Sequence, residues 1–362
     1  MGDTSFSYLP FDNVWKMRID HPYSLIMEDG PLVWSCGQCP LDEEGVVLFP
    51  GNLMAQAQTV AGFIERYLGQ MGCATSAIGR LVVYYVKVVS DNVARLKALF
   101  CEAFGQSVQV IPVAVPHFYY EGMLIEVDVF ASDEKAASHR FIDEESGLTI
   151  DISDAGPLLW VMVSSPRIAD RDVGLALNRL LGYAHLSCDT LLAGQWFLPV
   201  GCDIADLVSS RSGDVTRVCD THADIMAVLT FAKAPASVSQ PAGAIAGTPG
   251  LSMSLRMAGG YFSLTALDTS PDRSLVQQTA EIMRAVGIAF AGNALSFRDV
   301  RKATTHYIAD SSAEALHDNM SIRNRYYAKP GPASTGLPVA GLMLPGAQIS
   351  ISLFGAMSRH GR

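Results

Sequence analysis

The sequence has few charged residues and no long apolar run. Only 17% of its 362 residues are Asp, Glu, Lys or Arg, whereas 49% are hydrophobic. That balance fits large buried interfaces between structural units or a stable oligomer. No apolar run reaches the roughly 18 residues that a membrane-spanning helix needs, and the first ten residues lack the pattern of a secretory signal. We therefore expect a cytoplasmic protein that has no membrane partner.

The sequence also lacks a basic surplus and the common catalytic motifs. Its 26 Lys and Arg face 36 Asp and Glu, a net charge of −10, which argues against a nucleic-acid partner. The H-E-x-x-H, Walker, G-x-G-x-x-G and G-x-S-x-G patterns are absent from the sequence. The histidines are scattered without metal-ligand spacing, so we expect neither a metal nor a cofactor.

The cysteines are odd in number and scattered along the chain. Seven cysteines are spread along the chain, which is typical of a reducing compartment rather than a disulfide framework. Cys36 and Cys39 have C-x-x-C spacing, but they follow a predicted strand instead of opening a helix, where a redox dithiol normally lies. No second pair completes a zinc site. We interpret both as ordinary buried or pocket-lining thiols.

What the chain does have is an internal repeat. The pattern Gly30-Pro31-Leu32-Val33-Trp34 recurs as Gly156-Pro157-Leu158-Leu159-Trp160, and a looser version follows at Gly259-Gly260-Tyr261-Phe262. Each is preceded by an alternating apolar segment, so each predicts a β-hairpin with a tight glycine turn. Three hairpins at intervals of about a hundred residues indicate one ancestral unit used three times.

We accordingly predict three units, residues 1–131, 132–250 and 251–362. The first should have the order ββαβαββ, with a helix over residues 53–71 closed by Gly72 and a second helix over 91–104. The third should repeat that order: Gln58-Thr59 precedes Gly72 by the same spacing by which Gln278-Thr279 precedes Gly292. The middle unit is the least regular, with a second helix expected to start at Asp203. Residues 132–145 are expected to form a linker.

Several of these segments resemble the Rid (YjgF) family of enamine/imine deaminases. In the first unit they are Pro22-Tyr23-Ser24, Gly37-Gln38-x-Pro40-Leu41-Asp42 and the helix ending at Gly72; in the third they are Ala294 to Thr304 and Pro332-Ala333-x-Thr335. Such proteins form homotrimers with pockets at the subunit interfaces. The resemblance implies an α/β (α+β) chain whose three ββαβαββ units form an intramolecular pseudo-trimer, sheets inside and helices outside. It implies a monomer or dimer rather than a homotrimer of chains.

The resemblance also indicates where chemistry would lie. In active members an arginine holds the substrate carboxylate and a glutamate near the end of the last strand handles the proton. Here the arginine position is Ser334 in the third unit, Gly243 in the middle unit and lies within Gln106-Ser107-Val108 in the first. The glutamate is kept as Glu126 in the first unit, while its counterpart in the third is Ser350. Glu126 is therefore the candidate acid or base, although a solvated carboxylate at a strand end is an equal alternative.

Four further positions are candidates for substrate binding. Tyr23, Gly37 and Ser334 match pocket positions of the family, and His117 lies on an aromatic loop next to the strand of Glu126. The plainer alternatives are a core tyrosine, a turn glycine and a surface histidine. His306, within a predicted strand, is interpreted as structural.

The resemblance thus implies a diverged Rid-like hydrolase or deaminase that acts on a small imine, enamine or related metabolite at an inter-unit pocket, within a biosynthetic pathway. Without the arginine we expect ordinary 2-iminoacids to bind poorly. A chorismatase-like hydrolase of a cyclic enol ether is an alternative, although the sequence shows no basic cluster for a dicarboxylate. A non-catalytic protein that binds a metabolite or partner is another: a pocket filled by Trp34, Phe118 and Tyr120 would favour it, whereas Glu126 among polar partners would favour an enzyme.

Overall fold

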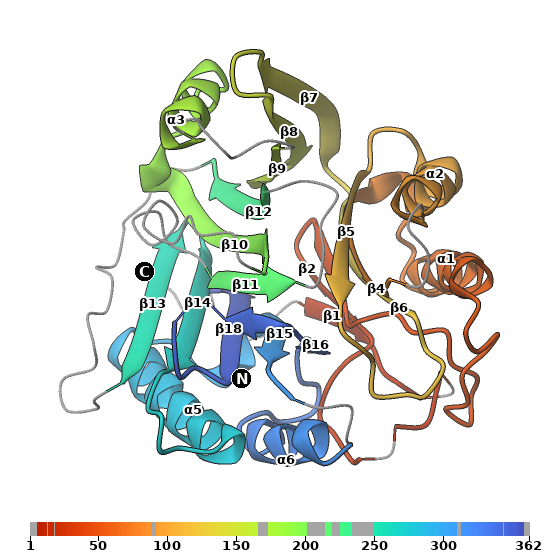
Figure 1. The fold of residues 1–362 in the computed structure, drawn as a ribbon, viewed down its shortest axis with the longest axis vertical. Coiled ribbons are helices and arrows are strands. Elements are labelled where there is room, and N and C mark those ends of the chain that lie inside the picture. Colours follow the sequence, from red (N-terminus) through yellow and green to blue (C-terminus); the bar gives the residue numbers. More distant parts are fainter. Residues whose placement is uncertain are drawn as a thin grey trace.

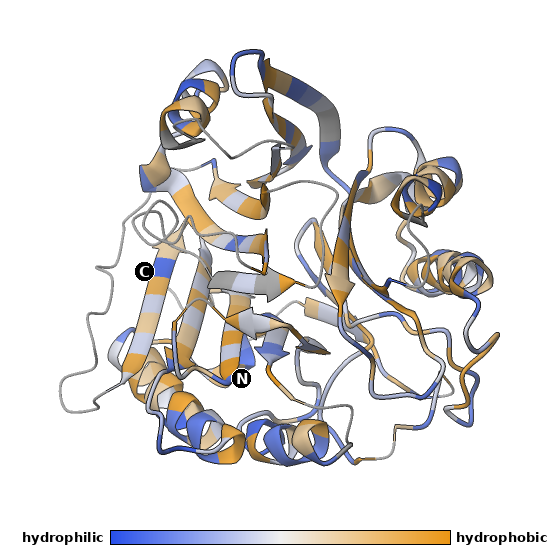
Figure 2. Ribbon diagram, in the orientation of Figure 1, coloured by the Kyte–Doolittle hydropathy of each residue, from blue (hydrophilic) through white to orange (hydrophobic). Residues whose placement is uncertain are grey.

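The chain folds into three β-sheets that face a common centre, with the helices on the outside (Figure 1). The computed structural model describes residues 6–12, 14–17, 19–87, 92–165, 173–200, 214–218, 225–233, 250–309, 313–342 and 344–357. The outer helices carry hydrophilic stripes on one side and apolar stripes on the other (Figure 2). The helices therefore pack their apolar stripes against the outer face of a sheet and turn their hydrophilic stripes to solvent. No helix in the described ranges is long and apolar enough to cross a membrane.

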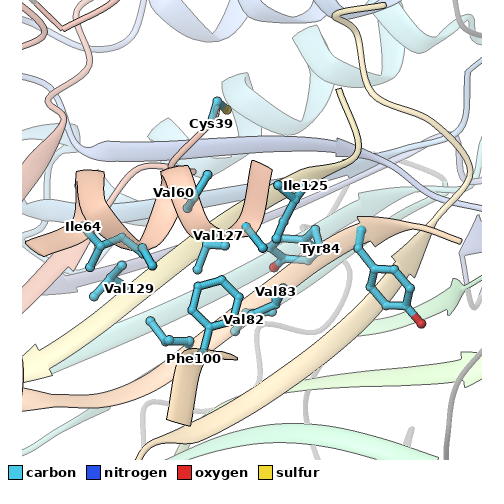
Figure 3. Packing of buried hydrophobic residues seen from close by; sticks show 14 of the residues in the cluster. Cys39, Val60, Ile64, Val82, Val83, Tyr84, Phe100, Ile125, Val127 and Val129 are labelled. Carbon is cyan, nitrogen blue, oxygen red and sulfur yellow. The ribbon is translucent and has the colours of Figure 1, made fainter. Parts of the chain in front are cut away.

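The first sheet has the strand order β1-β2-β3-β6-β4-β5. Its strands are β1 (Phe6–Leu9), β2 (Ile26–Asp29), β3 (Leu32–Ser35), β4 (Ile78–Val86), β5 (Gln109–Val115) and β6 (Ile125–Ser132). Helices α1 (Leu53–Gln70) and α2 (Asn92–Phe104) pack on one face. In Figure 3, Val60 and Ile64 of α1 lie against Val127 and Val129 of β6, and Phe100 of α2 lies near Val82.

The third sheet has the order β13-β14-β18-β15-β16. Its strands are β13 (Leu251–Ala258), β14 (Tyr261–Asp268), β15 (Val300–Tyr307), β16 (Ala333–Pro338) and β18 (Ile349–Ala356). Helices α5 (Leu275–Gly292) and α6 (Ala313–Asn324) lie side by side outside it (Figure 1). Ser274 begins α5 with a reciprocal capping box to Gln277, which satisfies two backbone N–H groups at the helix start.

The middle sheet has the order β17-β11-β10-β12-β9-β8-β7. Its elements are β7 (Lys135–Asp143), β8 (Leu148–Ala155), β9 (Leu158–Ser165), α3 (Val173–Tyr183), β10 (Leu191–Pro199), β11 (Asp214–Val218) and β12 (Ile225–Ala232), joined at its edge by β17 (Gly341–Leu342) from near the C-terminal end. The linker predicted at residues 132–145 is wrong: most of it is β7, because its alternating side chains pair with β8. The helix start predicted at Asp203 falls outside the described residues.

A common five-strand pattern runs through the three sheets. In each, a hairpin is followed in space by the last strand of the unit, then by the third strand, and then by a parallel fourth strand. The hairpin turns have glycines at positive φ: Gly30, Gly156 and Gly259. This confirms the predicted fold class of three repeated α/β units with sheets inside and helices outside.

The connection from the first helix to the third strand repeats most closely. In all three units one residue in the left-handed region follows the helix: Gly72, His185 and Ala294. The next N–H then bonds back to a helical carbonyl, at 2.9, 2.8 and 2.8 Å respectively. A single 3-10 turn comes next, and the third strand begins directly after it. Only the first unit uses glycine here, although glycine adopts this conformation at least cost.

This geometry corrects the alignment made from sequence. Gly72 is equivalent to Ala294 rather than to Gly292, which lies inside α5. The equivalent glutamines are Gln56 and Gln278, since each side chain ties its helix to the loop before the last strand. Gln56 bonds Gly122 O at 2.8 Å and Leu124 N at 2.7 Å. Gln278 does the same with Gly346 O and Gln348 N, both at 2.8 Å.

Candidate functional site

A cavity of about 90 Å³ lies between the first and third units. That is several times the space one water needs, so the cavity suits a small metabolite. Its floor and walls come from the first sheet, the aromatic loop after β5, helix α6 and strand β16; the lining residues include Tyr23, Gly37, Glu126, Tyr307, Arg323 and Ser334.

Glu126 reaches this cavity because of the alternation along β6. Ile125 and Val127 point toward the helices (Figure 3), so Glu126 points to the opposite face of the strand. Opposite it runs the segment after β3, where the backbones of Gln38 and Val127 pair at 2.8 and 3.1 Å. A Cβ atom at Gly37 would overlap the carboxyl group of Glu126. Gly37 is thus the residue that makes room for the candidate acid.

The surroundings of Glu126 favour its protonated form. Its side chain is 9% exposed, and burial, reinforced by the nearby charge of Asp128, raises its pKa to about 8. Lys302 acts in the opposite direction but is itself paired with Asp128, at 2.8 Å. At neutral pH Glu126 is therefore mostly a neutral acid, able to give up a proton.

Asp128 and Lys302 form a buried cluster behind the cavity that ties the units together. Lys302 Nζ donates to Ser35 O at 2.9 Å and to Thr335 Oγ1 at 2.7 Å, and Thr335 donates to Asp128. Ser35 and Asp128 belong to the first sheet, whereas Lys302 and Thr335 belong to the third. Each charge in the cluster has partners, as a buried ion pair requires.

Tyr23 and Ser334 are brought together at the seam between the two sheets. Ser24 N bonds Pro332 O at 3.2 Å, and Ser24 Oγ bonds Gly331 O at 2.8 Å. Tyr23 is buried, which raises its pKa. Its hydroxyl lies by Ser334 and is a buried polar atom without a hydrogen bond within normal distance in the described part of the chain. A buried hydroxyl in that state is available to a ligand.

Arg323 is the residue that sequence reasoning missed. It lies on α6, is 3% exposed and lines the cavity. Its Nε and one Nη donate to Asn319 Oδ1 at 3.1 and 2.8 Å, and among the described residues no carboxylate is paired with it. Leu316, Met320 and Arg323 follow one helical face. An arginine in an apolar stripe is a signal that could have pointed to it.

The other candidates separate into those at the cavity and those elsewhere. Phe118 and Tyr120 line the cavity. His117, which lies between β5 and Phe118 in the sequence, is not among the lining residues. Trp34 lies at a different cavity. His306 is buried and bonds Gln195 at 3.0 Å, with a pKa that burial lowers to about 3.

Cys36 and Cys39 are buried free thiols on the cavity wall. Burial, aided by Glu126, raises the pKa of both well above the ordinary thiol value, so the reactive thiolate is disfavoured. In the described ranges there is no group of three or more His, Cys, Asp or Glu that could hold a metal ion.

The sheet registers show what the other units place at the same positions. Glu126 pairs with Tyr84, Met226 with Phe197, and Ser350 with His306 at equivalent points of the three sheets. Ser334 is equivalent to Val110 of β5, because Ala333 pairs with Lys302 as Gln109 pairs with Arg80. The alignment with Gln106-Ser107-Val108 is therefore corrected, although arginine is still absent there. The middle-unit stretch Pro241-Ala242-Gly243 falls outside the described residues.

Comparison with known proteins finds similarity over the first unit. The Endoribonuclease L-PSP family model matches residues 16–133. A RutC family protein from Pyrococcus abyssi is 26% identical over 113 residues, which is 31% of this chain and 87% of that protein.

Solved structures align with about a third of the chain. A YjgF/YER057c/UK114 family member from Mycobacterium tuberculosis is 21% identical, with a TM-score of 0.30 over 35% of this chain and 99% of that one. A putative endoribonuclease from Thermotoga maritima is 22% identical, with a TM-score of 0.31 over 35% and 98%. E. coli TdcF with bound serine is 15% identical, with a TM-score of 0.30 over 35% and 99%. Over residues 16–133 this chain is therefore similar to the proteins of the Endoribonuclease L-PSP and RutC families.

Proposed function

We propose that this protein is a hydrolytic deaminase of a small imine or enamine that carries a negative charge, and that it acts in the cytoplasm at the cavity between the first and third units. The observation that carries the proposal is Glu126: a buried carboxyl group with a pKa near 8 that faces a cavity in which Gly37 leaves it room. Buried carboxyl groups with such a shift are suited to acid–base catalysis near neutral pH.

The chemistry needs only a proton carrier and water. For an enamine, Glu126 would protonate the β-carbon, which gives the iminium form of the imine and leaves Glu126 as the carboxylate. Water then adds to the C=N carbon, Glu126 carboxylate accepts the proton of that water, and the proton passes to nitrogen. Collapse of the resulting carbinolamine breaks the C–N bond, returns its hydroxyl proton to the Glu126 carboxylate and releases ammonia and the carbonyl product, so that every atom of the water is accounted for. One carboxyl group alternates between acid and base.

Arg323 would hold the negative group of the substrate. A buried guanidinium without a carboxylate partner favours an anion in the adjacent cavity, because charge-assisted hydrogen bonds are strong in such surroundings. Arg323 comes from helix α6 instead of the strand position occupied by Ser334. The serine still predicts weak turnover of 2-aminoacrylate, whose carboxylate is attached directly to the reacting carbon.

The alternatives are distinguished by the cavity lining. Glu126, Arg323 and Ser334 supply the polar partners that an enzyme needs, while Phe118 and Tyr120 add an apolar wall. A dicarboxylate substrate of the chorismatase type would need a second cation, and Arg323 is the one cationic side chain among the described lining residues. A binding protein would retain ligand affinity but show no turnover.

The test is an ammonia-release assay with a panel of freshly generated imines, with and without a carboxylate. Glu126→Gln keeps the size of the side chain but removes its proton, and we expect a loss of at least ~10²-fold in turnover. Glu121→Gln is the matched control, since Glu121 is exposed and nearby in sequence. Equal turnover by wild type and Glu126→Gln would refute the role of Glu126.

Arg323→Gln tests the substrate charge separately. We expect kcat/KM for anionic imines to fall by about 10- to 100-fold, as for other charged hydrogen bonds, with little change for a neutral imine. Arg325→Gln is the control, because Arg325 is an exposed arginine two residues away. An equal loss on neutral and anionic substrates would point to a structural role for Arg323 and contradict the proposed recognition.

A further inference from the structure

A second cavity of about 90 Å³ lies where the three sheets meet, apart from the candidate active site. In each unit, three of the lining residues occupy equivalent positions, on the second hairpin strand, the third strand and the last strand. In the first unit the set is Trp34, Arg80 and Phe130; in the middle unit Trp160, Ala193 and Thr230; in the third Ser263, Lys302 and Phe354. Within each sheet the first residue of the set pairs directly with the last. The cavity therefore lies on the axis that relates the three units.

Departures from the repeat open this cavity. Ser263 takes the place of two tryptophans, Thr230 the place of two phenylalanines, and Ala193 the place of two cations. All three substitutions replace a large side chain with a small one. Those of Ser263 and Thr230 also add a hydroxyl group to the wall, so a largely apolar space gains polar partners.

The positive charges of Lys302 and Arg80, the two cations at this cavity, differ in whether a carboxylate neutralises them. Lys302 is paired with Asp128 at 2.8 Å. Arg80 is 1% exposed, and its Nη2 donates to the carbonyls of Leu229 and Val161 at 2.8 and 3.3 Å, while its Nε donates to Gln109 at 3.2 Å. No carboxylate pairs with Arg80 among the described residues, and burial alone lowers its pKa, to about 9.

The hydrogen bonds of Arg80 use only part of its guanidinium group. Nε and Nη2 are directed to protein acceptors, so the N–H groups of Nη1 are left for another partner. The rings of Phe130 and Trp160, whose centroids both lie 5.9 Å from the guanidinium carbon, form the cavity wall beside it. A buried guanidinium with free donors next to a largely apolar cavity is stabilised by a counter-ion.

We propose that this axial cavity binds a small monovalent anion, a halide or a carboxylate no larger than acetate, through Arg80 and the hydroxyl groups of Thr230 and Ser263. The anion would contact side chains of all three units and so stabilise their assembly. The site is independent of the proposed catalysis, because none of these three residues lines the cavity of Glu126.

The test is thermal unfolding in sodium chloride, formate or acetate, compared with sodium gluconate at the same ionic strength. Gluconate is the reference because it is too large for the cavity. We expect a saturable rise of about 2–4 °C in the unfolding temperature with the small anions but not with gluconate. Arg80→Gln should abolish the difference between the salts, whereas Arg298→Gln, at an exposed arginine, should keep it.

A second measurement holds even where Arg80→Gln does not fold. Crystals of the unmodified protein grown in sodium bromide should show an anomalous scattering peak within hydrogen-bond distance of Arg80 Nη1. Salt effects of the same size in Arg80→Gln and wild type, or bromide crystals without a peak in the axial cavity, would overturn the proposal.

Discussion

Replacing Glu126 with glutamine should change how the stability of the protein depends on pH. The pKa of Glu126 is raised to about 8 in the folded protein, from an ordinary value of 4.5. Between these two values the folded state holds a proton that the unfolded state has released. The free energy of unfolding therefore falls as pH rises through this window, and the contribution of Glu126 levels off above pH 8.

The size of the effect follows from the shift. A raised pKa costs about 1.4 kcal/mol of stability per unit, so a shift of about 3.5 units costs roughly 5 kcal/mol once the pH exceeds 8. Between pH 5 and pH 7 the same linkage amounts to roughly 2.5 kcal/mol. Glutamine does not titrate, so Glu126→Gln should lack this part of the pH dependence. Below pH 4.5 the two proteins should be of similar stability.

Urea unfolding followed by tryptophan fluorescence at pH 5, 6, 7 and 8 measures this directly. We expect the difference in free energy of unfolding between Glu126→Gln and wild type to grow by roughly 2.5 kcal/mol from pH 5 to pH 7, in favour of the variant. Glu121→Gln should run parallel to wild type because Glu121 is exposed. If the curves of Glu126→Gln and wild type are parallel as well, Glu126 is not the buried neutral acid that the structure indicates.

Three further predictions concern the neighbours of Glu126 and the assembly. Gly37→Ala should lower turnover more than stability, because the added Cβ displaces the flexible end of Glu126; paired kinetic and unfolding measurements check this, and unchanged kinetics would contradict it. Lys302→Met should destabilise the protein by about 3–5 kcal/mol, since Asp128 would be left buried without its cation. In urea unfolding, the double variant with Asp128→Asn should recover much of the lost stability. A double variant no more stable than Lys302→Met would argue against the ion pair. Because one chain supplies three units, light scattering should give the mass of a monomer or dimer, and a trimer of full chains would contradict the intramolecular arrangement.

The repeat itself could be predicted from sequence because turn chemistry is local. Gly30 and Gly156 fit left-handed turn positions that other residues adopt at a cost, so the hairpins showed in the residues alone. The first long helix, predicted over residues 53–71, was placed almost to the residue, since an apolar stripe at helical spacing must face a sheet. Glu126, Gly37, Tyr23 and Ser334 were predicted together and do line one cavity.

Two features that were predicted wrongly from the sequence, the helix alignment and strand β7, depend on contacts between distant segments. The alignment of Gly72 with Gly292 failed because Ala294 holds the left-handed position after α5 without being glycine, at a local cost that tertiary packing outweighs. The strand β7 was mistaken for a linker because its stability comes from pairing with β8, not from its own polar residues.

Only the tertiary structure placed Arg323 in the candidate site and Arg80 on the axis. The apolar residues beside each arginine are compatible with burial, but the sequence does not say which cavity the side chain meets, since that is decided by which elements pack around it. Arg323 is enclosed by the seam between the first and third sheets, and Arg80 by the meeting of all three. The sequence determined how each unit folds, because hairpin turns and helix stripes are local properties; the packing of three unequal copies decided where the buried charges lie, because that depends on residues far apart in the chain.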